Sequence, residues 1–334
     1  MTQAAQLAQY GANNVGLSFK NRIINGDMTI DQRNNGSSIT NPGNNIYTVD
    51  RWLINTAFTG SVGRNLGGVT PPAGFNNYLG MSVGAAGQSA TNYSFRQVIE
   101  GFNMADLGWG TASATPVTLS FWVRSSLTGT FGGAIQNEAA NRSYPFGYTI
   151  SAANTWQQVT VTIPGDTTGT WGGANNGYGL QLTISYGAAA ARQGPAGAWA
   201  AADYRSVTGQ VDLVTNNGAT FYITGVQLEK GTVATSFDYL PYGTELALCQ
   251  RYYETVSNQG GGFWYTVRNE GVTCRVILNF YVIKRAGPTV TLSGSVGSGT
   301  YAPLASVLGT SVFNADCGGS SPCSFSMYTA SAEL

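Results

Sequence analysis

The chain has 334 residues, enough for two ordinary domains or one large β domain. Sixteen Lys and Arg balance sixteen Asp and Glu, so the formal net charge is +0, which argues against a nucleic-acid-binding protein that works by neutralising phosphates. Hydrophobic residues make up 43% and charged residues only 10%; a sizeable core is available, which argues against disorder.

In chain order, QAAQLAQY (3–10) favours a short N-terminal helix or an arm, which we assign to residues 1–20. From residue 21 to residue 243 short apolar runs are separated by Gly, Asn and Pro clusters. The clearest strands are PVTLSFWVRSS (116–126) and TWQQVTVTIPGD (155–166), whose apolar residues alternate with polar ones. Alternation and regular turn spacing predict an all-β fold, a jelly-roll β-sandwich.

The segment TELALCQRYYE predicts a short connector helix over 244–254, because its apolar residues recur at roughly helical spacing. Residues 255–334 then predict a smaller C-terminal β-rich domain. We expect no membrane insertion, because no run of eighteen apolar residues exists, and we expect no secretory signal in the first residues.

The chain has four cysteines. Cys249 and Cys274 stand in apolar stretches, which favours buried free thiols. Cys317 and Cys323 flank GGSSP, so a small disulfide loop is an alternative for them. Reduced thiols are favoured because no export signal accompanies them.

No histidine is present, so Ser-His and Cys-His catalytic arrangements are excluded. Glycoside hydrolysis by paired carboxylates needs no histidine, but the candidate acids stand in no recognisable motif. We therefore expect a protein that is not an enzyme, with a polysaccharide depolymerase as an alternative. The candidate acids are Asp106, Glu138, Asp166, Asp203, Asp212 and Glu270.

Residues 21 to about 230 resemble the jelly-roll carbohydrate-binding modules of the galactose-binding type, through NGDMTI, VTLSFWVRSS and FYITGVQLEKG. The resemblance implies sugar binding on aromatic side chains, and members often hold a structural calcium ion between the first and last strands. Thr29 and Thr224 stand where acidic residues would be, leaving only Asp27 and Glu229 nearby. We therefore expect no metal ligands and no cofactor, with a structural calcium ion left open.

NRIINGDMTIDQRN near the start and LEKGTVATSFDYLPYGTELALCQRYYE at the end of the module resemble tail-fibre and other virion appendage proteins of tailed bacteriophages. The resemblance implies a structural virion protein, often a homotrimer, whose partners are other virion proteins and host-surface polysaccharide. Residues 1–20 would attach it to the particle. A capsid decoration protein or a neck adaptor with no receptor role is the alternative.

Two sets of residues carry the expected interactions. Aromatic residues in Gly-rich loops are the candidates for stacking on sugar rings, and core packing or subunit contact is the alternative for each. They are Trp171, Tyr178, Trp199, Tyr204, Phe263, Trp264 and Tyr265. Apolar residues of the connector are the candidates for packing between domains or subunits, each stabilising by about 1.5–3 kcal/mol if fully buried. They are Phe237, Tyr239, Leu240, Tyr242, Leu246, Leu248, Tyr252 and Tyr253.

Overall fold

The computed structural model describes residues 20–88, 92–257, 274–293, 304–317 and 327–334. Residues 1–19, with most of the predicted helix or arm, lie outside the described residues, as do Phe263, Trp264, Tyr265 and Glu270. Within the described part of the chain, no helix is both long and apolar enough to cross a membrane.

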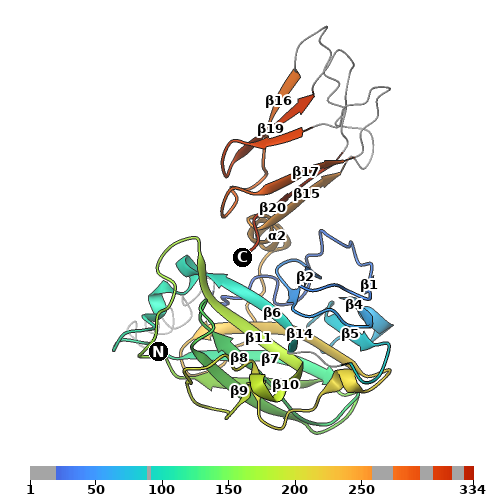
Figure 1. Cartoon of the computed structure of the whole chain (residues 1–334), viewed down its shortest axis with the longest axis vertical. Coiled ribbons are helices and arrows are strands. Elements are labelled where there is room, and N and C mark those ends of the chain that lie inside the picture. The colour runs from blue at the N-terminus through green and yellow to red at the C-terminus, as the bar shows by residue number, and fades with distance from the viewer. Residues whose placement is uncertain (1–19, 89–91, 258–273, 294–303, 318–326) are drawn as a thin grey trace, which may run out of the picture.

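Two six-stranded antiparallel sheets pack face to face and form the body of the molecule (Figure 1). The first sheet has the order β1 (Ile39–Thr40), β4 (Gly60–Arg64), β5 (Leu79–Val83), β14 (Thr220–Lys230), β7 (Val117–Ser125) and β10 (Gln157–Ile163). The second has the order β2 (Ile46–Tyr47), β3 (Leu53–Ile54), β6 (Asn92–Glu100), β11 (Tyr178–Ala188), β8 (Gly129–Gln136) and β9 (Ser143–Ile150). The predicted all-β jelly-roll sandwich is confirmed.

The alternation in β7 and β10 produces the predicted inner face. Leu119 and Phe121 are fully buried, and Phe121 lies opposite Val159 in the antiparallel register. On β11 and β6 the inner face carries aromatic residues, with Tyr186 and Phe95 in contact at 5.1 Å between ring centroids. Successive side chains of a strand point to opposite faces, so the residues between these positions face outward.

After β14 the chain crosses to a single helix, α2 (Tyr242–Gln250), which agrees with the predicted connector helix to within a few residues. Two three-stranded antiparallel sheets follow and form the C-terminal unit, which projects from one end of the body (Figure 1). The first sheet is β15 (Tyr253–Ser257), β20 (Met327–Ser331) and β17 (Thr289–Ser293). The second is β16 (Cys274–Asn279), β19 (Val312–Cys317) and β18 (Leu304–Val307).

The structure places three of the four cysteines. Cys249 is a buried free thiol on α2, as expected. Cys317 lies opposite Cys274 in the backbone register of β19 and β16. Cys323 lies outside the described residues, so the small-loop disulfide stays a prediction.

Candidate functional sites: the glycan-binding candidates and the connector junction

The outer face of the second body sheet is polar, and the chain itself covers much of it. Gln136, Gln181 and Thr183 point away from the core, yet each is almost completely buried. Residues 189–212, called the covering segment below, lie across β8 and β9 and include two short parallel strands. These strands are β12 (Gln193–Gly194) and β13 (Ser206–Val207).

Hydrogen bonds hold the covering segment on the sheet. Ser143 and Ala200 exchange two backbone bonds of 3.0 and 2.9 Å, and the Val211 amide donates to the Thr130 carbonyl at 2.7 Å. The Gln136 amide donates to the Asp203 carboxylate at 2.7 Å. The outward side-chain amide of Gln136 on β8 is therefore occupied by a protein partner and is closed to a glycan.

Asp203 is the charged centre of the covering segment. It forms ion pairs with Arg192 and Arg205, the latter at 2.9 Å between Arg205 Nε and Asp203 Oδ1. Burial alone would raise the pKa of Asp203, but hydrogen bonds from Arg205 and Gln136 outweigh burial and lower it. This carboxylate therefore fixes the segment and is not held protonated as a general acid would be.

Tyr178 and Tyr204, two of the glycan candidates, lie on this side of the body. Tyr178 is half-buried, and its hydroxyl donates to Gln181 Oε1 at 2.8 Å. Tyr204 belongs to the covering segment and packs against Gly194, where an added Cβ would lie 2.3 Å from the ring. Gly194 is needed there because any larger residue would displace Tyr204.

Trp171 and Trp199 form one cluster with the buried Trp109. Their ring centroids lie 4.7 to 5.4 Å apart, edge to face. The indole N–H of Trp171 donates to Asp166 at 3.1 Å, and that of Trp199 donates to the Pro164 carbonyl at 2.8 Å. Both rings are partly exposed. The sequence alone could not show this grouping, because Trp109 stands far from the other two.

The connector residues divide into a buried and an exposed set. Leu246 and Leu248 pack with Tyr252, which is fully buried. Tyr239 and Tyr242 are instead 54% and 63% exposed. The remaining connector candidates have separate partners: Phe237 contacts Phe75, Leu240 lines a surface pocket, and Tyr253 lies beneath Arg33.

The two segments that carry the bacteriophage resemblance meet at the junction between the body and the C-terminal unit. Ile24 and Ile30 pack against the apolar face of α2 and Tyr252. The Asn25 amide donates to the Glu245 carboxylate, and Gln32 Nε2 donates to the Tyr253 carbonyl at 2.9 Å. More than 200 residues separate these partners in the sequence.

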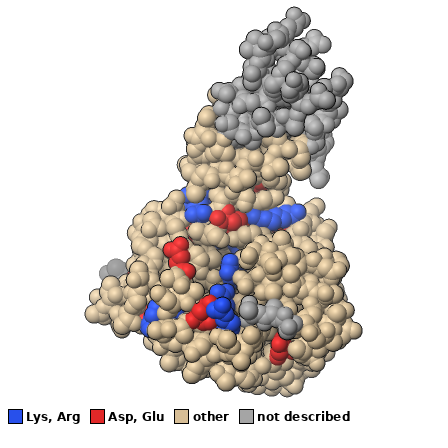
Figure 2. Space-filling model, in the orientation of Figure 1, with Lys and Arg blue, Asp and Glu red and all other residues tan. Residues whose placement is uncertain are grey.

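Charged side chains surround this apolar contact. Charges are sparse on the face shown in Figure 2; one group forms a band where the C-terminal unit meets the body, and another lies lower on the body. Glu333 pairs with the buried Arg51 and with Arg33, the latter at 2.9 Å. Arg251 forms two bonds of 2.9 and 3.0 Å to Glu100 of β6.

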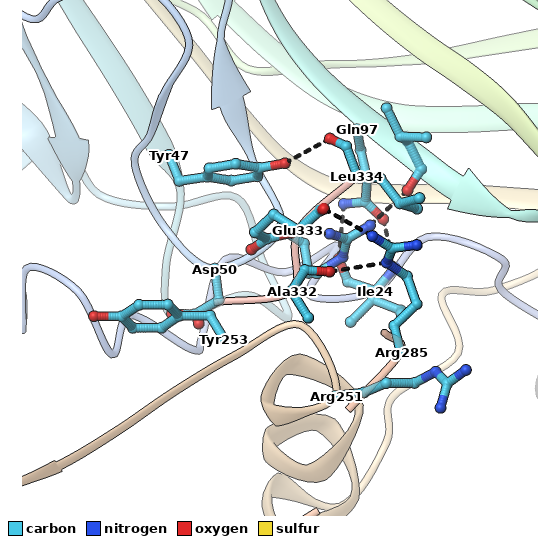
Figure 3. A network of polar contacts seen from close by, with 12 residues as sticks. Ile24, Tyr47, Asp50, Gln97, Arg251, Tyr253, Arg285, Ala332, Glu333 and Leu334 are labelled. Atoms are coloured by element: carbon cyan, nitrogen blue, oxygen red, sulfur yellow. Dashed lines mark hydrogen bonds and ion pairs between the residues drawn. The ribbon is translucent and has the colours of Figure 1, made fainter. Parts of the chain in front are cut away.

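Arg285 belongs to the same network and forms hydrogen bonds to two other segments of the chain (Figure 3). It donates to the carbonyls of Ala332 and Glu333 at 2.8 and 3.0 Å, and to the Asn176 carbonyl of the body at 2.8 Å. Residues of this network, Arg51 and Glu333 above all, were missed by the sequence analysis. They lie 282 positions apart, and nothing in their local sequence marks them.

Two carboxyl groups at the junction have raised pKa values. Burial raises the pKa of Asp50 to about 6, although Arg33 and Gln32 oppose the effect. Burial likewise raises the pKa of Glu245 to about 7, and the carboxylates of Asp27 and Asp238 add to the shift. The junction therefore holds groups that titrate near neutral pH.

The region where the resemblance to carbohydrate-binding modules would place calcium ligands is occupied by hydrogen bonds within the chain. The Thr29 hydroxyl donates to Asp27 at 2.8 Å, and Arg64 Nη1 donates to the Thr29 carbonyl at 2.7 Å. Thr224 donates to the Asn77 carbonyl at 2.7 Å. Among the described residues, no group of three or more His, Cys, Asp or Glu could hold a metal ion.

Among the other candidate acids of the depolymerase alternative, Asp106 and Asp166 each pair with an arginine, and Glu138 is exposed. Asp106 accepts two bonds from Arg22, which lower its pKa. For Asp166, burial alone would raise the pKa, but the bidentate bonds from Arg142 and its other hydrogen bonds lower it. Asp212 is half-buried, and burial raises its pKa. The lowered pKa values of Asp106 and Asp166 suit structural ion pairs better than proton donors.

No protein-family model matches the chain, and no curated protein matches it. The tailspike protein 4 enzymatically active domain of bacteriophage CBA120 is 14% identical, with a TM-score of 0.35 over 64% of this chain and 22% of that chain. A CBM4 structure is 14% identical, with a TM-score of 0.33 over 62% of this chain and 98% of that chain. The CBM22-1 xylan-binding domain of Paenibacillus barcinonensis Xyn10C is 11% identical, with a TM-score of 0.28 over 60% and 97%. At these scores nothing about ligand, activity or assembly follows for this chain.

Proposed function

We propose that the chain is a structural virion protein of a tailed bacteriophage, a tail-fibre or appendage subunit that contributes to attachment to host-surface glycans. One observation carries the proposal: the two segments that resemble appendage proteins form a single contact, the junction. Ile24, Ile30, Leu246, Cys249 and Tyr252 make its apolar centre.

A fixed junction suits an appendage because a distal unit on a flexible joint cannot transmit force or orientation. Here apolar packing, the Arg251–Glu100 pair and the Glu333 pairs act together. Such contacts immobilise the C-terminal unit on the body. That unit would then be held in a fixed orientation relative to the body.

Self-association as a homotrimer belongs to the proposal. Ile277, Tyr281 and Ile283 of the C-terminal unit are each more than 60% exposed, at 64%, 64% and 62%. Contact between copies of the chain would remove these side chains from water. Light scattering of the purified chain tests the point: a mass of three chains supports the trimer, and a monomer contradicts it.

Part of the proposal is that the chain binds glycan without cleaving it. The carboxylates of Asp106, Asp166 and Asp203 are engaged by arginines that lower their pKa values. A retaining or inverting glycosidase needs one carboxyl group that stays protonated. Release of reducing ends from host polysaccharide by the purified chain would contradict this part.

Immunogold electron microscopy of virions that carry the chain tests the virion role. Gold on the tail or its fibres supports the appendage. Gold spread over the shell supports instead a capsid decoration protein, and gold at the neck supports an adaptor. Virions with no gold, beside a positive control on a known structural protein, would contradict any virion role.

The covering segment favours a second candidate, a decoration or adaptor protein with no receptor role. Asp203 and Ala200 close polar groups on the body sheet that could otherwise meet a glycan. Binding of the fluorescent full chain to host cells separates the candidates. An appendage binds and is displaced by host polysaccharide, whereas a decoration protein does not bind.

A further inference from the structure

A cavity of about 910 Å³ lies between the body and the C-terminal unit. One wall comes from residues 29–35 and from Arg64 of β4. The other comes from α2 and from the outer face of β15 and β20, which rise from the junction (Figure 1). Any molecule held there touches both parts of the chain.

The wall from the C-terminal unit consists of Tyr253, Thr255, Met327 and Thr329, and three of these four side chains carry a hydroxyl group. Thr329 of β20 lies between Thr255 of β15 and Thr291 of β17 in the register. The next row has Ser331 between Tyr253 and Thr289. The alternate residues of these strands face the core of the unit, so the face toward the cavity carries hydroxyl groups and the side chain of Met327 but no charge.

The wall from the body carries arginine side chains that already form ion pairs with carboxylates of the chain. Arg64 Nε lies 3.8 Å from Asp31, and Arg33 pairs with Glu333 while its guanidinium stacks 3.6 Å from the Tyr253 ring. Such compensated arginines donate hydrogen bonds but attract no net charge. A neutral ligand therefore fits better than an anion.

Tyr242 stands at the rim of the cavity and is 63% exposed. An exposed tyrosine offers an apolar ring face together with a hydroxyl group. Beside it the cavity carries the side-chain amides of Asn35 and Asn77 and the hydroxyls of Thr255 and Thr329. These groups are both donors and acceptors, which is what the alternating C–H faces and hydroxyls of a sugar require.

We propose that this cavity binds a segment of a neutral oligosaccharide, an inference that rests on the proposed glycan attachment. A sugar ring stacks on Tyr242, and its hydroxyls meet Thr329, Thr255 and the arginine donors. Because the ligand contacts both the body and the C-terminal unit, binding also stabilises the junction. Binding of a glycan would thereby stabilise the contact between the C-terminal unit and the body.

The test uses the full chain and an array of bacterial surface polysaccharides with neutral and acidic members. The neutral polysaccharide bound most strongly is then titrated by calorimetry. Tyr242→Ala removes the stacking ring, and Thr329→Val removes a hydroxyl with little change of shape. Phe102→Ala is the control, because Phe102 is an aromatic residue that is 57% exposed and does not line the cavity.

We expect Tyr242→Ala to weaken binding at least tenfold, Thr329→Val several-fold and Phe102→Ala not at all. The polysaccharide should raise the Tm of the unmodified chain and of Phe102→Ala, but not that of Tyr242→Ala. Unliganded Tm values show whether the variants fold.

Unchanged affinity in both cavity variants overturns the cavity as the site and leaves glycan attachment standing. Binding of acidic polysaccharides only, lost in Tyr242→Ala, overturns the neutral class. An unmodified chain that binds no polysaccharide overturns the attachment role together with this inference.

Discussion

The body and the C-terminal unit are built on different balances of forces. The body buries large apolar side chains completely, among them Trp52, Phe95 and Phe131. In the described part of the C-terminal unit, the buried apolar cluster is Phe280, Tyr328 and Ala330. Burial of apolar area is the main favourable term in folding, so the body is the part that can stand alone.

The C-terminal unit instead encloses an ion pair. Lys284 Nζ lies 2.7 Å from Glu254, and both side chains are completely buried. Glu254 also accepts from the Tyr281 amide and from the Tyr328 hydroxyl. A buried pair of this kind fixes the arrangement of its neighbours but adds little net stability. The unit therefore depends on polar contacts within it and on its junction with the body.

The largest loss of stability is expected for the variant Lys284→Met and is confined to the C-terminal unit. Lys284→Met leaves the Glu254 carboxylate buried without its cation, which costs about 3–5 kcal/mol. Hydrogen exchange should show loss of protection in β15, β17 and β20 while β7 and β11 keep theirs. Uniform loss over the whole chain would contradict the division into a self-sufficient body and a dependent unit.

The double variant Lys284→Met with Glu254→Gln sharpens this test. Removing both charges abolishes the buried unpaired ion, and Gln still accepts from the Tyr281 amide. We expect it to recover most of the stability lost in Lys284→Met. If the double variant is as unstable as the single one, lost packing and not the unpaired charge is the cause.

A smaller effect, about 2 kcal/mol, is expected at the junction for Arg51→Met. Glu333 loses its buried partner but keeps Arg33 at 2.9 Å, so the remaining charge is not wholly unpaired. Limited proteolysis should then cut between body and C-terminal unit. Arg124→Met is the control, since Arg124 bonds to the Asn154 carbonyl within the body, and it should leave the cleavage pattern unchanged.

The sequence predicted the body far better than the junction. The strands β7 (Val117–Ser125) and β10 (Gln157–Ile163) could be assigned because alternation is a local signal. The connector helix was also predicted from a local signal, the helical spacing of its apolar residues. The Glu333 pairs and the contact of Asn25 with Glu245 join residues more than 200 positions apart, and no local pattern encodes such partners.

The glycan candidates show the same limit. Trp171 and Trp199 were chosen as loop aromatics, but their partner Trp109 and their acceptors become apparent only in three dimensions. The covering segment was equally hidden, because its polar residues resemble any surface loop. Tyr242 was chosen as a packing residue, whereas the fold leaves it exposed at a cavity.

The junction should also respond to pH in a direction opposite to that of ordinary surface carboxylates. Folding raises the pKa of Glu245 from 4.5 to about 7. Its contribution to stability is therefore fully present below about pH 4.5 and is lost as the pH rises through 7. Glu245→Gln should stabilise the chain by roughly 2 kcal/mol at pH 8 and by nothing at pH 4.5.

The measurement is the difference in unfolding free energy between Glu245→Gln and the unmodified chain across pH 4.5–8, which cancels every other titration. Gln keeps an acceptor for the Asn25 amide. Asp50, whose pKa is raised to about 6, should give the same sign over a lower pH window for Asp50→Asn. A difference that is constant with pH would mean that Glu245 is not buried against Asn25.

Tyr242→Ala is expected to change the free energy of unfolding least, although it is expected to weaken polysaccharide binding most. Tyr242→Ala removes a side chain that is 63% exposed, so the free energy of unfolding should change by less than about 0.5 kcal/mol. Chemical denaturation of the unliganded variant checks this. Little change in stability together with lost polysaccharide binding would separate the cavity's role from that of the junction beneath it. A large loss of stability would instead show that the C-terminal unit also depends on Tyr242. The unit would then be even less stable by itself, compared with the body, than its small apolar cluster indicates.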